Sequence, residues 1–218
     1  MQDYAAGKAW KQEKRQHILE TAYDLFSERG VIPVTIADIA GASGVGRATV
    51  FRYFTTKLDL VVAIGTWKWE EYIKTHDAFV TPEEMERMTG AEYLRFFLDA
   101  FIDLYRSHPD ILRFNYDFNS FLRYEAGTTD QKQPYLQMVD ALGVRFHELY
   151  ERGMKDGTLR DDIPEAMMFS SSFHIMLAAV TRYAAGLVVV LEDGSDPESE
   201  LVMLEELLLK RFTREKQP

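Results

Sequence analysis

The chain has 218 residues, of which 46% are hydrophobic and 28% charged, so it can bury a core in one large or two small domains. It has no cysteine, which excludes disulfides, thiolate metal sites and cysteine nucleophiles. The formal net charge of −10 is divided unevenly, because residues 1–60 carry eight Lys/Arg against seven Asp/Glu and residues 61–218 carry seventeen against twenty-eight. The acidity belongs to the C-terminal part, and it does not exclude a local cationic patch that attracts nucleic acid.

The first predicted helix runs from Lys8 to Arg29, and Gly30 ends it. Apolar side chains recur along it at helical spacing, at Ile18, Ala22, Leu25 and Phe26. Its early turns are basic, with Lys8, Lys11, Lys14 and Arg15. These first residues lack the apolar segment of a secretory signal, so we expect a cytoplasmic protein.

Two short helices across a glycine turn are predicted next. The first covers Ile36–Ala42, with Thr35 as its N-cap, and Gly44 is expected to take the positive φ of a tight turn. The second begins near Gly46 and buries Val50 and Phe54. Its outward side chains are Arg47, Ala48, Thr49, Arg52 and Tyr53. Such a short basic helix fits a major groove about 12 Å wide, so the pair is typical of a device that reads DNA.

Further amphipathic helices follow. One, capped by Thr55 or Thr56, runs through Leu58 toward Trp69 and ends before Pro82. The apolar spacing then predicts helices over about 94–105, 111–122, 136–155, 164–191 and 201–212, separated by His108–Pro109, a polar loop over 125–134, Gly157 and a loop over 192–197. No sustained period-two alternation indicates a sheet, so the predicted fold class is all-α with about nine helices.

The stretch from Met167 to Leu191 is long enough to span a bilayer. However, His174, Arg182 and a run of three serines interrupt it, and a central Arg alone costs about 2.5 to 3.5 kcal/mol on insertion scales. We therefore expect a buried interface helix here and no membrane partner.

The order of residues from Gln12 to about Trp69 resembles the TetR family of bacterial transcriptional repressors. The resemblance is carried by Ile18–Ala22, Leu25–Gly30, Thr35–Ala40, Thr49–Phe54 and Lys57–Leu60. The C-terminal part resembles the family only in its helical outline and in the Gly157–Asp162 turn. The resemblance implies a helix-turn-helix DNA-binding domain over residues 11–70, with its motif at about 35–54, and a ligand-binding and dimerisation domain over 71–214.

The resemblance further implies a homodimer that binds a palindromic double-stranded operator. Arg47 and Arg52 are the candidates for bidentate contacts with guanine, and Ala48 and Thr49 for contacts with thymine methyl groups. Gly46 and Phe51 replace a serine and a tyrosine that are usual in the family, so two hydroxyls are missing. Phosphate contacts should then depend on Thr35, Ser43, Thr49, Tyr53 and Lys57.

By the same resemblance the C-terminal domain binds a small effector. Aromatic residues are dense there, and polar residues interrupt several apolar helix faces. Core packing explains any one of these aromatic residues well, and interhelical hydrogen bonds explain the polar ones. A pocket made of them would suit a largely apolar effector. The candidate ligand-binding residues are Phe97, Phe101, Tyr105, Phe114, Asn115, Phe118, Asn119, Phe146, His147, Tyr150 and His174.

The last two helices, over about 164–214, are expected to form the homodimer interface, because residues 164–191 are apolar nearly all round. Small residues at Ser170, Ser171, Ala178 and Ala179 would allow close approach of helices.

Other classes of protein are less consistent with the sequence. Gly44-Val45-Gly46 lacks the rest of a dinucleotide fingerprint, the five histidines form no zinc motif, and no Gly-x-Ser-x-Gly elbow is present. We therefore expect no catalytic residues, no metal and no cofactor. A transcriptional activator of the same family and a helical protein-interaction module stay open as alternatives, as does, at low odds, an enzyme.

Overall fold

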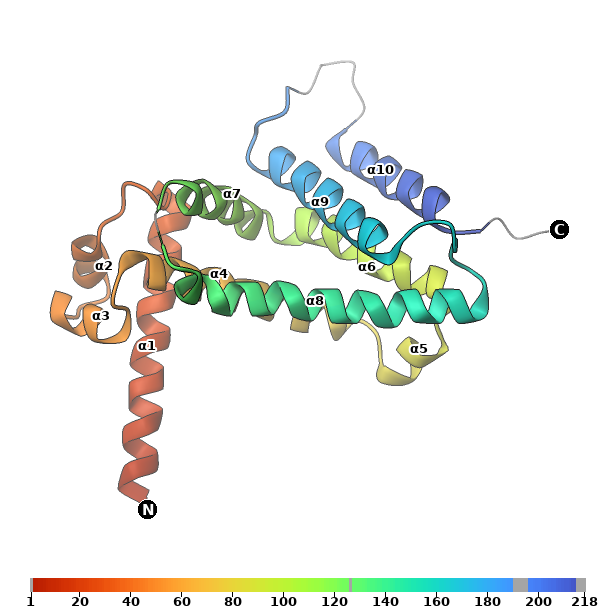
Figure 1. Ribbon diagram of the computed structural model, residues 1–218. Helices are drawn as coiled ribbons and strands as arrows, with labels where there is room; N and C mark the ends of the chain where they lie inside the picture. The colour runs from red at the N-terminus through yellow and green to blue at the C-terminus, as the bar shows by residue number, and fades with distance from the viewer. Residues whose placement is uncertain (1, 126, 190–195, 215–218) are drawn as a thin grey trace. The chain divides into compact units, whose positions relative to one another are not determined.

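The computed structural model describes residues 2–125, 127–189 and 196–214, with side chains for residue 7 and from residue 9 onward (Figure 1). This part of the chain forms ten helices and no strand, which confirms the predicted all-α class. No described helix is long and apolar enough to cross a membrane. The helices are α1 (Gln2–Arg29), α2 (Ile36–Ala42), α3 (Arg47–Tyr53), α4 (Lys57–Asp77), α5 (Pro82–Arg87), α6 (Gly90–Ser107), α7 (Pro109–Tyr124), α8 (Thr129–Asp156), α9 (Glu165–Ala184) and α10 (Pro197–Phe212).

The chain divides into two compact units. The head unit comprises Met1–Trp69 and Phe114–Gln137, and the body unit comprises Glu70–Arg113 and Met138–Pro218. Three helices, α4, α7 and α8, therefore contribute residues to both units. The sequence pattern did not predict that residues 114–137 belong with the N-terminal helices.

Local side-chain chemistry positions the two short helices of the head unit as expected. Thr35 and Asp38 form a capping box at the start of α2: the Thr35 hydroxyl oxygen accepts from the Asp38 N–H at 3.2 Å, and the Asp38 carboxylate accepts from the Thr35 N–H at 2.8 Å. Gly44 has φ of 64°, which a residue with a Cβ rarely adopts. The α2–α3 turn is therefore fixed by residues that the sequence identifies.

A single hydrophobic cluster supports this arrangement. Ile18, Ile39 and Val50, one from each of the first three helices, are fully buried in it. Phe114, Phe118 and Phe121 of α7 complete the cluster from the other side. The ring of Phe118 lies so close to Gly65 that a Cβ there would come within 3.0 Å of a ring carbon. Aromatic residues of α7 thus form part of the core under the helix-turn-helix.

In the body unit, α6, α9 and α10 pack on one another, and α8 crosses the start of α6. The end of α8 and the turn after it also cap α6: the carboxylate of Asp156, the last residue of α8, accepts from the Gly90 N–H at 2.7 Å, and the Thr158 hydroxyl oxygen accepts from the Ala91 N–H at 3.0 Å. Leu159 pairs with Thr213 in an isolated β-bridge. The Gly157–Asp162 turn therefore joins the ends of three helices.

Several predicted boundaries are wrong. α1 starts earlier than predicted, at Gln2, and α5 follows Thr81, where only a break was expected. Residues 125–134 are not a loop throughout, because α8 starts at Thr129 and contains Pro134. Thr128 and Gln131 form a capping box there, with the Gln131 N–H donating to the Thr128 hydroxyl at 3.3 Å and the Gln131 side-chain oxygen accepting from the Thr128 N–H at 3.1 Å.

The predicted helix over 164–191 is also too long. α9 ends at Ala184, and Gly186 follows with φ of 67°. Leu191 and most of the predicted loop over 192–197 lie outside the described residues. α10 starts at Pro197, because the Asp196 carboxylate caps it by accepting from the N–H groups of Glu198 and Ser199.

Candidate DNA interface and effector site

The candidate DNA interface is the outward face of α3. Arg47, Ala48, Phe51 and Arg52 are exposed, whereas Val50 is fully buried. Gly46 is the N-cap of α3, and because glycine has no side chain the cap makes no side-chain hydrogen bond. Two guanidinium groups five positions apart thus lie on a short helix whose opposite face is anchored in the head core.

The end of α3 is held by cation–aromatic contacts. The guanidinium carbon of Arg52 lies 5.5 Å from the centroid of the Tyr53 ring, and that of Arg15 lies 5.1 Å from the centroid of the Phe54 ring. Burial lowers the pKa of Arg15 from its ordinary value of 12.5. The half-buried Tyr53 packs against the head core, so its ring has a structural role whatever its hydroxyl contacts. The sequence predicts Arg15 as one of the N-terminal cations, but it does not predict the contact of Arg15 with Phe54 at the end of α3.

The candidate phosphate contacts are placed unequally. Thr35 is exposed, and its side chain is part of the α2 cap. Thr49 is half-buried on α3. Ser43 is buried, and its hydroxyl donates to the Ile39 carbonyl at 2.6 Å. A phosphate contact by Ser43 would therefore require an exchange of this hydrogen bond.

Lys57, at the first position of α4, has its ammonium group turned toward the head unit. It donates to the Ile32 carbonyl at 3.0 Å and lies 5.2 Å from the centroid of the Phe121 ring. Burial lowers the pKa of Lys57 below its ordinary value, while Glu125 and Asp38 oppose this shift. No local sequence pattern encodes these contacts, because Ile32 and Phe121 lie far from Lys57 along the chain.

The candidate effector residues fall into both units. Phe114, Asn115, Phe118 and Asn119 belong to the head unit. Phe114 packs against Tyr23 and Phe26, at ring-centroid distances of 5.5 Å and 6.4 Å, and Asn119 is exposed and donates to the Asn115 carbonyl at 2.8 Å. Phe114 and Phe118 thus make the contacts of core residues.

The candidate aromatic residues of the body unit meet in one cluster. Phe97 lies 5.8 Å from Phe101 and 5.3 Å from Phe146 between ring centroids. Two residues of α9 that were not among the candidates, Phe169 and Phe173, join it: Phe169 lies 5.2 Å from Phe146, and Phe173 lies 5.9 Å from Phe101. Their four-residue spacing on one helix is the signal that could have identified them. Tyr105 instead contacts Tyr183, at 6.4 Å.

The remaining candidates lie nearer the surface. His147 is exposed, and its Nδ1 lies 3.1 Å from both carboxylate oxygens of Glu165, whose hydrogen bond and charge raise the pKa of the imidazole. His174 is exposed beside Phe173, and the half-buried Tyr150 donates its hydroxyl to the Ile163 carbonyl at 3.4 Å. His147 and His174 are thus surface residues, and Tyr150 connects α8 to the segment before α9.

Four buried side-chain polar atoms have no hydrogen-bond partner within the described residues. They are His76 Nδ1, Asn115 Oδ1, Ser172 Oγ and Thr181 Oγ1. Ser172 and Thr181 both lie on the buried side of α9, the helix that supplies Phe169 and Phe173. Buried polar groups are normally satisfied, so the unpartnered hydroxyl of Ser172, which neighbours Phe173 in the sequence, is consistent with a site for a partly polar ligand.

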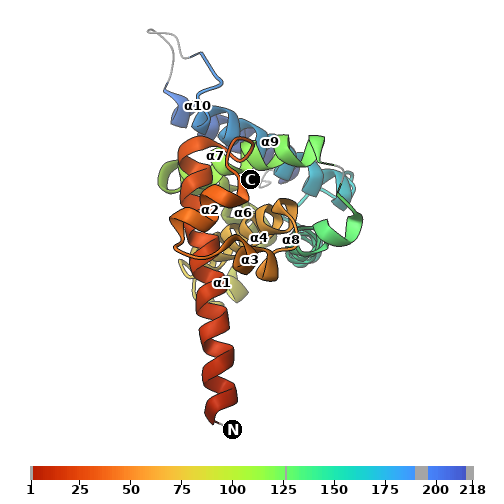
Figure 2. The same cartoon turned by 90° about the vertical axis from the view of Figure 1, so that its left-hand side faces the viewer.

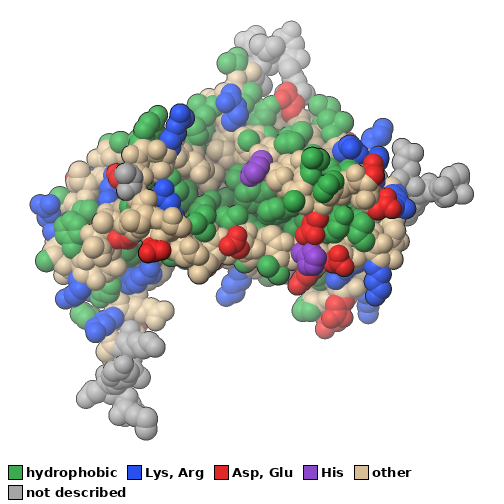
Figure 3. Space-filling model, in the orientation of Figure 1, with side chains coloured by type: hydrophobic (Ala, Val, Ile, Leu, Met, Phe, Trp, Pro, Cys, Tyr) green, Lys and Arg blue, Asp and Glu red, His purple; other side chains and the backbone are tan. Residues whose placement is uncertain are grey.

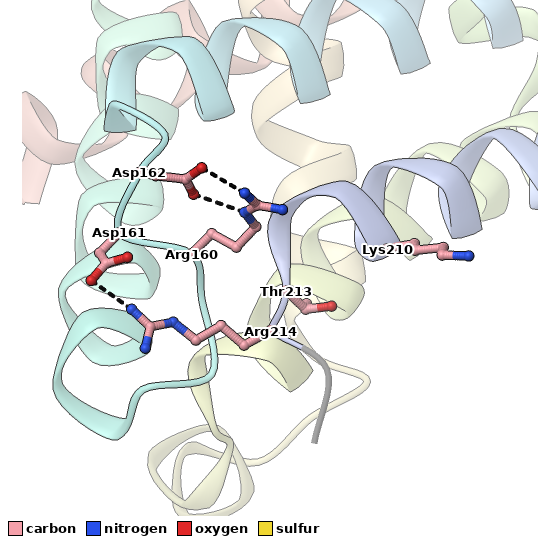
Figure 4. A pocket seen from close by; sticks show the side chains of 6 residues that line it. All are labelled: Arg160, Asp161, Asp162, Lys210, Thr213 and Arg214. Atoms are coloured by element: carbon pink, nitrogen blue, oxygen red, sulfur yellow. Dashed lines mark hydrogen bonds and ion pairs between the residues drawn. The ribbon is translucent and has the colours of Figure 1, made fainter. Parts of the chain in front are cut away.

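Two surface cavities of the body unit lie elsewhere. One, of about 570 Å³, is open and charged, and it is lined by Arg160, Asp161, Asp162, Lys210, Thr213 and Arg214 (Figure 4). Its arginines are already paired, Arg160 with Asp162 at 2.5 Å and Arg214 with Asp161 at 2.6 Å. The other, of about 390 Å³, is a groove along α9 and α10 lined mainly by apolar residues, among them Met203, Leu204 and Leu207.

The sequence of the helix-turn-helix region is similar to that of known regulatory proteins. Residues 18–64 match the family described as bacterial regulatory proteins, tetR family. The regulator AcrR of Shigella flexneri is 43% identical over 60 residues, which cover 28% of this chain and only 27% of AcrR. The repressor KstR2 of Rhodococcus jostii is 27% identical over 180 residues, covering 81% of this chain and 82% of KstR2.

The fold is also similar to that of solved structures over most of the chain. The transcriptional regulator FadR of Bacillus subtilis, determined in complex with stearoyl-CoA, superposes with a TM-score of 0.67 at 16% identity, over 89% of this chain and 97% of FadR. At this identity the likeness concerns the fold. The capped α2–α3 pair lies within the residues that match the tetR family of bacterial regulatory proteins, so the helix-turn-helix of this chain is similar to that of the family.

Proposed function

We propose that this chain is a transcriptional repressor that binds a palindromic operator as a homodimer and releases it when a small, largely apolar effector binds. The observation that carries the proposal is the exposed face of α3, which presents Arg47 and Arg52 from a helix held by a capped neighbour and a shared core. Arg47 and Arg52 would contact guanine, and Ala48 and Thr49 thymine methyl groups. Thr35, Ser43, Tyr53 and Lys57, again with Thr49, are proposed for the phosphates.

The proposed dimer rests on an exposed apolar surface of α9 and α10. On α9, Met167 and Ile175 are 59% and 42% exposed; on α10, Met203 and Leu207 are each 57% exposed. Hydrophobic side chains are also visible over α9 on the face drawn in Figure 3. Because the groove of about 390 Å³ adjoins Met203 and Leu207, a second copy of the chain would cover a continuous apolar strip.

The proposed effector site is the aromatic cluster of the body unit around Phe97, Phe101 and Phe146. An apolar wall with few polar groups is typical of small-molecule sites, and the unpartnered hydroxyl of Ser172 would supply one polar group. The structure of FadR from Bacillus subtilis in complex with stearoyl-CoA, a ligand with a long apolar part, supports this proposal. α4, α7 and α8 contribute residues to both units, so we propose them as the elements through which effector binding alters DNA binding.

The DNA-binding proposal is tested by selection of bound duplexes from a randomised pool, followed by mobility-shift titration. We expect a palindrome, and we expect Arg47→Ala to cost about 1 to 3 kcal/mol of discrimination at one symmetric pair of positions. Lys155→Ala, which removes an exposed charge from the body unit, is the control. Failure of the wild-type protein to select any sequence would refute the proposal, and a rise of reporter expression on binding would favour an activator.

The dimer proposal is tested by analytical ultracentrifugation of Met203→Glu/Leu207→Glu. The two charges should convert the wild-type dimer into a monomer, since each would be buried without a partner. Val144→Glu is a matched control, because Val144 is 62% exposed on α8 and lies outside the proposed interface. A monomeric wild-type protein at micromolar concentration would contradict the assignment.

The effector proposal is tested by thermal-shift screening with uncharged apolar, planar aromatic and highly charged compounds. We expect stabilisation by members of the first two classes, and this stabilisation should be lost in Phe101→Ala, whose own melting temperature is measured without ligand. Stabilisation by highly charged compounds alone would contradict an apolar site.

A further inference from the structure

α1 continues well beyond the core that anchors it. Among the side chains of α1 that the structure describes, Ile18 and Leu19 are the first buried ones, and none of the residues 9–17, here called the arm, is buried. At a rise of 1.5 Å per residue these nine residues are about 13 Å long. In two views at right angles, the N-terminal half of α1 projects past α2 and α3 (Figures 1 and 2). The arm is thus a helical segment that contributes no side chain to the hydrophobic core of the head unit.

The arm is basic. It carries Lys11, Lys14 and Arg15 against a single acidic residue, Glu13. Lys11 is exposed, and the Lys14 ammonium lies 4.7 Å from the ring centroid of Trp10, which is itself 52% exposed. No hydrogen bond or ion pair within the described residues engages either lysine, so both charges are available to an outside partner.

The arm joins the rest of the head unit beside α3. At its last turn, Arg15 lies over the ring of Phe54, the residue that caps the C-terminal end of α3. His17 Nε2 lies 3.2 Å from the carbonyl oxygen of Ser43, in the turn that precedes α3. The C-terminal turn of the arm therefore contacts both ends of α3, the helix that carries Arg47 and Arg52.

We propose that the arm binds the phosphate backbone of duplex DNA outside the base pairs contacted by α3, with Lys11 and Lys14 as the contacting residues. The inference rests on the proposed DNA-binding function and adds a second, sequence-independent contact to it. Charge complementarity selects this occupant: a protein partner would need an apolar strip, and the arm offers only Trp10, which Lys14 partly covers. Ammonium groups one helical turn apart suit neighbouring phosphates of one strand.

The test measures the dissociation constant of the full-length protein against salt concentration. Two duplexes are used, one with the selected site in long flanks and one that ends at the site. Each lysine–phosphate contact contributes about 0.9 to the slope of log K against log salt, so Lys11→Ala/Lys14→Ala should lower the slope by about 1.8 per bound chain on the long duplex. The control, Lys74→Ala/Lys155→Ala, removes the same charge from exposed positions of the body unit and should leave the slope unchanged.

Two further results separate the inference from the function on which it rests. The arm variant should select the same palindrome as the wild type, and trimming the flanks should weaken the wild type but not the variant. If the wild type binds the site and the arm variant keeps the wild-type slope on the long duplex, the arm proposal is wrong while the proposed function stands. If the wild type binds no duplex, both fail.

Discussion

At the scale of single residues, Asp156 shows how one carboxylate stabilises the start of a distant helix. It accepts from the Gly90 N–H at 2.7 Å, and from the Thr158 N–H and hydroxyl at 2.9 Å and 2.6 Å. Burial favours its neutral form, but these hydrogen bonds outweigh burial and hold the pKa of Asp156 below its ordinary value. A carboxyl of this kind adds stability above its unfolded-state pKa, and the contribution is lost as the pH falls through the folded-state pKa.

We therefore expect Asp156→Ala to lower the free energy of unfolding at neutral pH by about 1 kcal/mol, the usual value of a capping side chain. The difference from wild type should shrink as the pH falls below about 4, because the wild-type carboxyl is then protonated as well. Denaturant titrations across this pH range measure it. Asp140→Ala removes an exposed carboxylate from the same helix and should have little effect throughout. A difference that persists undiminished in acid would contradict the assignment.

The same scale shows which site residues sequence reasoning can place. The Thr35 cap and the Gly44 turn depend on neighbours within a few positions, and both were predicted correctly. The orientation of Lys57 depends on the Ile32 carbonyl and on Phe121, far along the chain. The inward turn of Ser43 likewise depends on a competition between solvent and the Ile39 carbonyl. Contacts between residues a few positions apart can be predicted from a sequence, whereas the distant partner of a long side chain cannot.

At the scale of elements, the crossing of α6 and α8 depends on two glycines. A Cβ on Gly90 would lie 2.1 Å from the Gly153 Cα, and that neighbour is backbone, which cannot move aside as a side chain can. We expect Gly90→Ala to destabilise the protein by about 1 to 3 kcal/mol, as overpacking does. Gly143→Ala is the matched control: a Cβ there meets nothing within 4 Å, so alanine should stabilise α8 by about 0.5 to 1 kcal/mol. Opposite shifts in melting temperature are expected, and equal shifts would contradict the packing.

Helix ends were harder to predict than helices. The start of α8 was placed too late because Pro134 was taken as a boundary, yet the Thr128–Gln131 capping box starts the helix before it. α9 was placed too long because its apolar composition continues past Ala184, although Gly186 ends the helix. Composition indicates that a segment will be buried, and a specific cap decides where its hydrogen-bond ladder stops.

At the scale of the whole chain, the all-α class followed from periodicity, but the division into units did not. The spacing of Phe114 and Phe118 shows that one face of α7 is buried, and it does not show what covers that face. In the structure their neighbours are Tyr23, Phe26 and Gly65 of the head unit. For the same reason the sequence grouped candidate effector residues that belong to different units.

Among the acidic side chains that the structure describes, the buried Glu205 has an effect on stability opposite to that of Asp156. Glu205 of α10 is 3% exposed and lies 3.4 Å from Arg95. Burial, followed by the charge of Asp99, raises the pKa of Glu205 to about 7, although Arg95 opposes the shift. The folded state therefore binds this proton more tightly than the unfolded chain, and the stability contributed by Glu205 declines as the pH rises from its ordinary pKa toward 7.

Glu205→Gln tests this account, because glutamine keeps the shape and stays neutral at every pH. The variant should melt close to the wild type at about pH 5, where wild-type Glu205 is protonated in the folded protein, and should be the more stable protein at about pH 8, where ionised Glu205 and Asp99 repel one another. Glu206→Gln, at the exposed neighbouring position, is the control and should not gain stability over the wild type between these two pH values. Thermal melts across this range measure the difference. A constant difference between wild type and Glu205→Gln would mean that Arg95 stabilises the buried carboxylate as fully as water does, and the contact of Glu205 with α6 would then carry no pH dependence.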